Sequence, residues 1–312
     1  MTRPCTAVSP SLGHHAARIP IALPAADRRR LECRGRAGHT GVKRRPEQGS
    51  ERLIPRGHKG GVSVRVTVIG CSGSFPGPDS PASSYLIEAE GYALVLDLGN
   101  GALGSLQRFR SLYEIDAVCI SHLHADHCLD LCGYWVARTY RPNGPAPRIP
   151  VHGPEDTARR MAQAYDLDPE PGMSGAFDFR TLRRGPYEIG PFRVTTALMP
   201  HPVEAYAFRI EYGGRTLAYS GDTGASETLI ELARDADLFL CEASFLEGPG
   251  LPPGLHLTGR EAGEHAARAG AGRLVLTHLV PWNDADVSLK EARDSGYEGP
   301  IDLAEVGARY TL

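Results

Sequence analysis

Residues 121–127, Ser-His-Leu-His-Ala-Asp-His, place three imidazoles and one carboxylate within six residues: His122, His124, Asp126 and His127. The preceding residues 116–120 are short, apolar and β-branched, which predicts a buried strand that ends at this cluster. Imidazole and carboxylate donors suit a borderline divalent cation such as zinc. Four donors packed this closely predict two ions.

One loop cannot fill two coordination spheres, so further ligands are expected downstream. His201 lies between two prolines that stop a strand and stiffen the turn. Asp222 follows an expected strand in Ser-Gly-Asp-Thr-Gly, and His278 follows the apolar stretch 273–277. Each is weak evidence alone, but all three lie at the end of an expected strand.

Taken in order, these motifs resemble the metallo-β-lactamase superfamily, from about residue 62 to residue 312. Glu242 in Cys-Glu-Ala-Ser-Phe and His256 in His-Leu-Thr are similar to the branch that contains ribonuclease Z and related phosphodiesterases. Gly-Cys-Ser-Gly-Ser at 70–74 and Asp-Leu-Gly-Asn-Gly at 97–101 also resemble that branch. Within it, the chain is most similar to actinobacterial atypical class II cyclic-nucleotide phosphodiesterases.

The resemblance implies a role for each matching residue. His122, His124 and His201 would hold one metal, Asp126, His127 and His278 the second, and Asp222 would bridge them. Asp126, His256 and Glu242 form the implied catalytic set. His256 would assist departure of the ribose alkoxide, with Glu242 as its partner, while Asp97 would fix the geometry of the loop and ligands without binding metal. Two divalent ions are implied, zinc first, although these ligands also accept manganese or iron.

The expected activity is hydrolysis of a small phosphodiester, with 3′,5′-cyclic AMP as the first candidate. Alternatives are a ribonuclease Z-like nuclease for tRNA 3′ ends and another hydrolase of this fold, acting on β-lactams or thioesters. Ribonuclease Z carries a long arm between its lone histidine and its bridging aspartate, whereas only 20 residues separate His201 from Asp222. Trp282 comes four residues after His278, and its indole could either stack on a base of the substrate or pack against the protein. The branch also implies a homodimer.

Composition points to an intracellular globular enzyme. Seven cysteines among 312 residues are scattered without framework spacing, which favours a reducing compartment, the cytoplasm. The sequence contains no stretch of 18 apolar residues, so no membrane span is expected.

Residues 1–61 hold 13 Lys and Arg against 4 Asp and Glu, a net charge of +9, which leaves −12 for residues 62–312. The acidic body argues against a nucleic-acid groove. The basic segment lacks periodicity and is expected to be a disordered extension or a start codon placed too early; the alternative is an arm that attracts nucleic acid.

The body, residues 62–312, is expected to be an α/β domain, an αββα sandwich of two mixed sheets flanked by helices. Strands are expected near 63–69, 84–89, 92–97, 116–120, 149–152, 176–182, 191–198, 205–212, 215–219, 237–241 and 273–277, and helices near 101–111, 128–140, 155–166, 225–235, 258–269 and 285–296. Gly213 and Gly214 predict a hairpin turn, and Thr258 with Glu261 has capping-box spacing.

Overall fold

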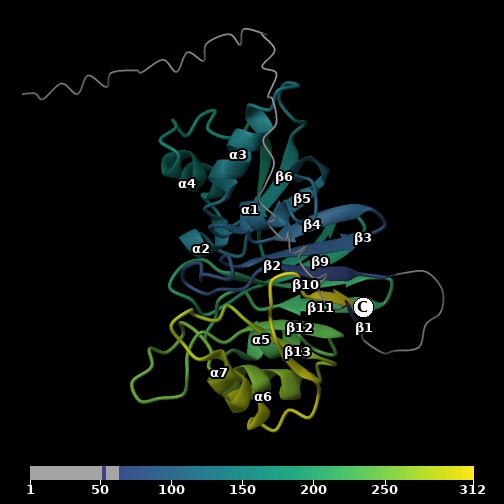
Figure 1. Ribbon diagram of the computed structural model, residues 1–312, viewed down its shortest axis with the longest axis vertical. Helices are drawn as coiled ribbons and strands as arrows, with labels where there is room; N and C mark the ends of the chain where they lie inside the picture. Colours follow the sequence, from purple (N-terminus) through teal and green to yellow (C-terminus); the bar gives the residue numbers. More distant parts are fainter. Residues whose placement is uncertain (1–50, 54–62) are drawn as a thin grey trace, which may run out of the picture. The chain divides into compact units, whose positions relative to one another are not determined.

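The computed structural model describes residues 51–53 and 63–312. The described residues form two mixed sheets, one of eight strands and one of seven, packed face to face with helices on their outer faces (Figure 1). The predicted αββα sandwich is therefore confirmed.

The elements follow one another in two similar halves. The strands are β1 (Glu51–Leu53), β2 (Arg65–Gly70), β3 (Ser84–Ala89), β4 (Tyr92–Leu96), β5 (Ala117–Cys119), β6 (Ile149–Gly153), β7 (Phe177–Thr181), β8 (Gly185–Ile189), β9 (Phe192–Leu198), β10 (Tyr206–Tyr212), β11 (Arg215–Tyr219), β12 (Leu238–Glu242), β13 (Leu274–Thr277), β14 (Ile301–Leu303) and β15 (Arg309–Thr311). The helices are α1 (Ala102–Leu106), the 3₁₀ turn η1 (Leu112–Glu114), α2 (Ala125–Cys128), α3 (Leu131–Thr139), α4 (Thr157–Ala164), α5 (Glu227–Leu232), α6 (Gly259–Ala269) and α7 (Ala285–Arg293).

Each sheet combines antiparallel and parallel pairs, and apart from the parallel pair β1–β15 the antiparallel pairs come first along the chain. The eight-stranded sheet has the order β1-β15-β2-β3-β4-β5-β6-β7, and pairing becomes parallel from β4 onward. The seven-stranded sheet, β14-β13-β12-β11-β10-β9-β8, becomes parallel from β11 onward. The carboxyl ends of parallel strands share one edge, so the residues that follow these strands gather there.

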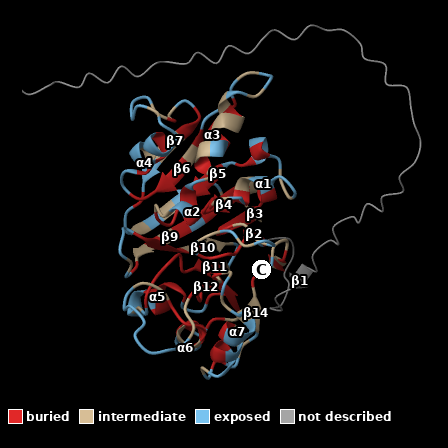
Figure 2. Cartoon of the chain, turned by 60° about the vertical axis from the view of Figure 1, so that its left-hand side comes forward, coloured by how far each residue is buried: buried red, intermediate tan, exposed pale blue. Residues whose placement is uncertain are grey.

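The core has three layers because the central strands are buried on both faces (Figure 2). On β4, Leu94 and Leu96 pack between the sheets, whereas Val95 packs outward beneath α1 and α3. On β12, Leu240 faces the inner layer and Phe239 packs against α5 and α6. Alternate residues of one strand thus belong to different layers, as the two-residue period of a strand requires.

Several elements differ from the expectations. Strands β8, β14 and β15 were not expected, since β8 contains Gly185 and Pro186 and the others span three residues each. The expected hairpin turn joins β10 to β11, with positive φ at Gly213 and Gly214, and the capping box at Thr258 begins α6. Among the described residues, no helix is long and apolar enough to cross a bilayer.

The expectation for residues 1–61 concerns a segment of which only Glu51–Leu53 is described. This tripeptide is strand β1 and pairs in parallel with β15, although the first element was expected at residues 63–69. The remainder of that segment lies outside the described residues.

Candidate active site

The seven candidate ligands lie together at the edge where the parallel strands of both sheets end. His122 and His124 occupy the loop after β5, and Asp126 and His127 lie in the short helix α2 that follows it. His201 follows β9, Asp222 follows β11 and His278 follows β13. Strand β10 is antiparallel to both β9 and β11, so β9 runs in the same direction as β11–β13 and ends at the same edge.

The first group consists of His122, His124, His201 and Asp222, whose nearest ligand atoms all lie within 4.8 Å of one another. His122 Nε2 is 3.0 Å from His124 Nδ1, and His201 Nε2 is 3.2 Å from the same atom. Asp222 Oδ2 lies 3.7 Å from His122 Nε2.

The second group consists of Asp126, His127, His278 and, again, Asp222. His127 Nε2 lies 3.1 Å from His278 Nε2, which in turn lies 3.0 Å from Asp126 Oδ2. Asp222 Oδ1 lies 3.2 Å from His127 Nε2 and 3.5 Å from His278 Nε2. Asp222 therefore faces both groups, one through each carboxylate oxygen.

Contacts on the outer side of three imidazoles fix which nitrogen faces inward. His127 Nδ1 is 2.7 Å from Asp97 Oδ2, and His201 Nδ1 is 3.0 Å from the carbonyl oxygen of Leu255. The Ser244 hydroxyl donates to the carbonyl of His278, so its oxygen is the acceptor for His278 Nδ1 at 2.6 Å. These contacts favour the tautomer with its proton on the outer nitrogen, in which Nε2 has a lone pair for a metal ion.

This arrangement fits divalent cations. His127 Nε2 and His278 Nε2 lie 3.1 Å apart and both lie within 3.5 Å of Asp222 Oδ1, an arrangement that a positive ion between them would stabilise. Asp222 Oδ1 is buried and accepts no hydrogen bond within the described residues. A buried carboxylate oxygen without a donor is costly unless a cation or an imidazolium neutralises it.

The electrostatics of the cluster without metal lead to the same conclusion. Burial lowers the pKa of His122 well below its ordinary value. Burial also disfavours charge on His127, but the Asp222 and Asp97 carboxylates outweigh it and raise the pKa of His127 well above its ordinary value. Burial would raise the pKa of Asp222, yet His127, His278 and His122 hold that pKa well below its usual range. The site thus keeps ionised carboxylates that attract positive charge.

Asp97 organises the second group without facing its centre. It accepts hydrogen bonds from the Ser121 amide at 2.6 Å, the Ser121 hydroxyl at 2.8 Å and the Tyr219 hydroxyl at 2.7 Å, in addition to His127. Asp97 and His278 both have a φ of 54°, a strained conformation that non-glycine residues adopt chiefly where surrounding contacts enforce it. Asp97 thus contacts one candidate ligand, His127, and belongs to neither group, while its role in fixing the loop and ligand geometry stays a prediction.

Two glycines of the quoted motifs allow the backbone to approach these ligands. A Cβ at Gly99 would lie 1.9 Å from the carbonyl oxygen of Asp126, and one at Gly73 would lie 2.3 Å from that of His278. Both positions exclude any larger side chain, because the clashing atoms belong to the backbone.

Glu242 and His256 form a pair beside the cluster. His256 Nδ1 lies 3.0 Å from Glu242 Oε1 and 3.9 Å from Asp222 Oδ2. The amides of Thr223 and Ser244 donate to Glu242 at 2.7 and 3.3 Å, which fixes the carboxylate. Burial opposes charge on His256, but Glu242 outweighs it and raises the pKa of His256 to about 9. Glu242, His256 and His278 also lie close enough to hold a cation.

Sequence reasoning missed three residues that orient the cluster: Ser121, Tyr219 and Ser244. Ser244 stands two residues after Glu242, and Tyr219 is the last residue of β11, directly before Ser-Gly-Asp-Thr. Their proximity to the motifs was visible, but their hydrogen bonds depend on long-range packing. Cys128, expected to pack beneath the loop, is buried and donates to the carbonyl of His124 at 3.2 Å.

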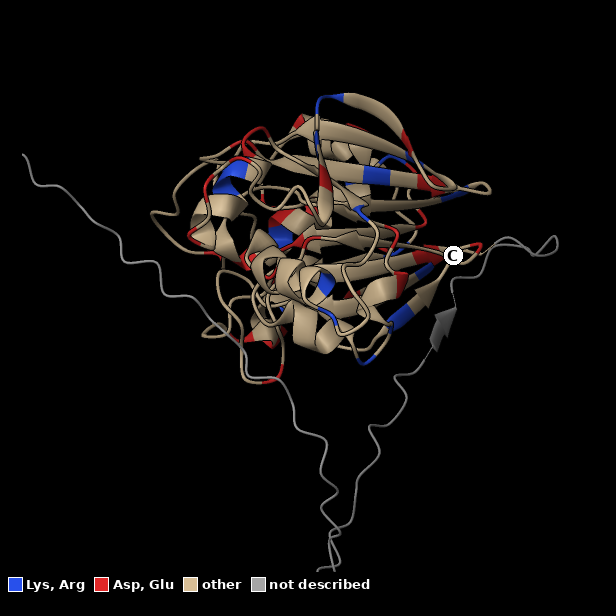
Figure 3. Ribbon diagram, turned by 90° about the horizontal axis from the view of Figure 1, so that it is seen from above, with Lys and Arg blue, Asp and Glu red and all other residues tan. Residues whose placement is uncertain are grey.

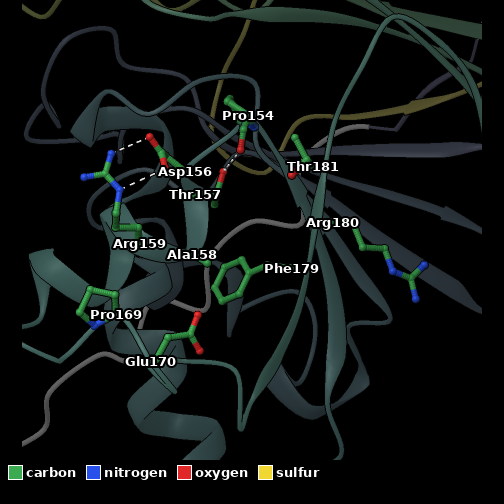
Figure 4. A pocket seen from close by; sticks show the side chains of 10 residues that line it. All are labelled: Pro154, Asp156, Thr157, Ala158, Arg159, Pro169, Glu170, Phe179, Arg180 and Thr181. Carbon is green, nitrogen blue, oxygen red and sulfur yellow. Dashed lines mark hydrogen bonds and ion pairs between the residues drawn. The ribbon is translucent and has the colours of Figure 1, made fainter.

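Away from these ligands, a hollow of about 350 Å³ lies between the turn after β6, the start of α4 and strand β7, as shown in Figure 4. Asp156 and Arg159 at its edge pair with each other, with Oδ2 and Nη2 2.6 Å apart, and Thr157 donates to the carbonyl of Pro154. None of the candidate ligands lines this hollow.

Comparison with known proteins agrees with this geometry. Residues 93–279 match the β-lactamase superfamily domain, and this segment contains all seven candidate ligands. The chain belongs to the β-lactamase superfamily. Within it, the uncharacterised protein Rv1339 of Mycobacterium tuberculosis is 45% identical over 261 residues, which cover 80% of this chain and 94% of that protein.

Two further members of the superfamily are similar over nearly their whole length. The probable metallo-hydrolase YhfI of Bacillus subtilis is 32% identical over 254 residues, covering 78% of this chain and 98% of that protein. Its crystal structure, described as a metallo-β-lactamase fold protein, superposes with a TM-score of 0.71 over 81% of this chain and 100% of that chain. Ribonuclease Z of Myxococcus xanthus is 28% identical, covering 77% of this chain and 95% of that protein.

Proposed function

We propose that the chain is a two-metal phosphodiesterase that hydrolyses a small cyclic phosphodiester, 3′,5′-cyclic AMP first among them. The observation that carries the proposal is the pair of four-residue groups that share Asp222. The superfamily, with relatives named metallo-hydrolase and ribonuclease Z, supports a metal-dependent hydrolase. In this proposal His122, His124 and His201 hold one ion, Asp126, His127 and His278 hold the other, and Asp222 bridges them.

When bound, two divalent ions would supply Lewis acidity and offset the charge that develops on the phosphorus oxygens. The residues of the chain supply the rest. Asp97, Ser244 and the Leu255 carbonyl hold three imidazoles in the tautomer that presents Nε2 inward. Ordered acceptors of this kind keep the ligand atoms in place without reorganisation during the reaction.

Hydrolysis of the cyclic ester adds water across one P–O bond, so the departing ribose oxygen must gain a proton. In the proposal His256 donates this proton, a role supported by the contact between its Nδ1 and Glu242 Oε1 at 3.0 Å, which leaves Nε2 for the substrate. Glu242 is fully buried and accepts two backbone amides, so it acts on His256 and not on solvent.

The alternative is a nuclease similar to ribonuclease Z. In this chain the residues between His201 and Asp222 are occupied by β10, a two-glycine turn and β11, which leaves no room for an inserted arm. Lys and Arg are scattered among Asp and Glu in the view of Figure 3. A scattered distribution favours a small substrate over a long polyanion.

A panel assay on the full chain tests the proposal. Cyclic AMP, cyclic GMP, 2′,3′-cyclic nucleotides, bis(p-nitrophenyl) phosphate, a tRNA precursor, a thioester and a β-lactam would be incubated with metal-loaded protein and with Asp222→Asn. Turnover of cyclic nucleotides by the wild type, and not by Asp222→Asn, supports the proposal. Processing of the tRNA precursor in preference to all small esters would favour the nuclease, and hydrolysis only of a thioester or β-lactam would overturn both.

A further inference from the structure

A cavity of about 450 Å³ opens beside His256, outside the metal cluster. Its walls come from the loops that follow β2, β12 and β13, together with the segment that precedes α6. The lining is largely apolar and includes Phe245, Leu251, Leu255, Val280 and Trp282. This volume is in the range of small-ligand pockets, which are apolar with a few fixed polar groups.

Trp282 is the unusual member of this lining, because 73% of its surface is exposed. Its ring centroid lies 4.9 Å from that of Phe75, with the planes tilted by 43°. The next residue, Asn283, donates from Nδ2 to the carbonyl of Ser244 at 2.8 Å and from its amide to that of Val280 at 2.9 Å. The indole is therefore supported by an aromatic neighbour and an anchored backbone while it remains largely open to solvent.

The cavity is continuous with the catalytic pair. His256 belongs to its lining and also contacts Glu242. The ring of Phe245 packs edge-on against the imidazole, with centroids 5.1 Å apart and planes at 88°. Ser244, which orients His278, lies in the same wall. A substrate with its phosphodiester at the cluster would extend its remaining atoms into this space.

We propose that this cavity is the base subsite of the enzyme and that Trp282 is the surface on which a purine of the substrate stacks. The inference rests on the proposed function, which it deepens by naming the cavity and the side chain that recognise the base of the substrate. Stacking on an aromatic side chain tolerates different bases, since every base has a π-face. The apolar walls offer few groups for reading base edges, so adenine and guanine should bind with similar affinity.

Fluorescence provides a test that needs no turnover. The chain has two tryptophans, and Trp135 is buried in another layer of the core. In Trp135→Phe the remaining emission reports Trp282. Adenosine 5′-phosphate and guanosine 5′-phosphate should both quench it, whereas ribose 5-phosphate, which has the same phosphate and sugar but no base, should not. Quenching by ribose 5-phosphate alone, or by neither nucleotide, would overturn the proposal.

Inhibition of bis(p-nitrophenyl) phosphate hydrolysis measures the contribution of the base. Adenosine 5′-phosphate should inhibit the wild type more strongly than ribose 5-phosphate. Trp282→Ala should reduce the ratio of the two inhibition constants (ribose 5-phosphate over adenosine 5′-phosphate) by about 5- to 100-fold. Trp282→Phe should restore most of it. Tyr140→Ala, which removes another exposed aromatic ring far from the cavity lining, should leave it unchanged.

The outcomes separate this inference from the proposed function. If cyclic nucleotides are hydrolysed but Trp282→Ala leaves the inhibitor ratio and the KM for cyclic AMP unchanged, the base subsite is wrong and the function stands. If no cyclic nucleotide is hydrolysed but nucleotides still quench Trp282, the subsite stands and the reaction is wrong. A fall in melting temperature of Trp282→Ala without any change in nucleotide binding would show that Trp282 only packs on Phe75.

Discussion

Asp222 is the residue on which the two groups of ligands depend, because its two oxygens face different histidines. Asp222→Asn keeps the shape of the side chain but removes the negative charge and one acceptor. We expect bound metal to fall from about two ions per chain to one or fewer, and phosphodiester hydrolysis to be lost. Elemental analysis after desalting measures the first effect.

A matched control is Asp178→Asn, which removes a carboxylate paired with Arg148 and Arg180 on the surface. It should keep both ions and full turnover. Two ions retained in Asp222→Asn would contradict the assignment of Asp222 as the bridge.

His256 permits a separate prediction about proton transfer. His256→Ala should keep its metal content while kcat for cyclic AMP falls by about 10²- to 10⁴-fold, the usual contribution of a positioned acid. The loss should shrink on bis(p-nitrophenyl) phosphate, because nitrophenolate leaves without a proton. Steady-state kinetics on the two substrates measure the difference.

Other outcomes for His256→Ala point to other roles. An equally large loss on both substrates, with metal retained, would indicate that His256 binds the phosphoryl group. A mild, equal loss accompanied by lower stability would indicate a purely structural residue before the cap of α6.

At the scale of elements, the sequence predicted the strands that carry chemistry better than those at the edges. Strands β4, β5, β12 and β13 are buried on both faces, so they stand out as short apolar stretches with polar residues of the site at their ends. Strands at or next to a sheet edge, such as β14 and β15, bury too little to leave a pattern and are fixed by pairing with distant strands. Helix α2 spans four residues, too few for a helical period.

The candidate ligands were visible because imidazoles at strand ends are distinctive by residue type. Their partners were not, since a serine or tyrosine has many ordinary uses. Tyr219 lies 122 positions from Asp97 along the chain, and only the packing of the two sheets brings their side chains together.

Strand β6 contains a histidine whose titration should affect folding. His152 is 4% exposed and its Nε2 has no hydrogen-bond partner among the described residues. Burial and the neighbouring Arg180 lower its pKa from 6.5 to about 4. Between these values the unfolded chain binds a proton that the folded chain does not, so stability falls as pH falls through this window.

His152→Phe tests this account because it keeps an aromatic ring at this position and removes the titrating imidazole. Between pH 6.5 and 4, the unfolding free energy of the wild type should fall by about 1–2 kcal/mol more than that of the variant. Urea denaturation at several pH values, with identical metal loading, measures the difference. Identical acid limbs for both proteins would show that His152 does not contribute.

At the scale of the whole body, the candidate metal centre joins the two sheets. His122 and His127 follow β5 of the eight-stranded sheet, whereas Asp222 and His278 follow β11 and β13 of the seven-stranded sheet. An ion held by ligands from both sheets binds the folded state and has no preformed site in the unfolded chain. Metal should therefore stabilise the body as a unit.

Mass action sets the size of this effect. At free metal about a thousand times above the dissociation constant, stabilisation is about 4 kcal/mol, which corresponds to roughly 8–15 °C for a body of this size. Chelation should lower the melting temperature by that order in the wild type, but far less in Asp222→Asn. Differential scanning calorimetry with elemental analysis of the same samples makes the comparison.

Hydrogen exchange would show whether the two halves respond together. Because the ligands come from both sheets, removal of metal should increase amide exchange in β5 and α2 and equally in β11 and β13. Faster exchange confined to the 121–128 segment would mean that only the first loop depends on metal. An unchanged melting temperature after complete loss of metal would contradict the inference that the ions link the two sheets. Ions held by ligands from both sheets must stabilise the folded body.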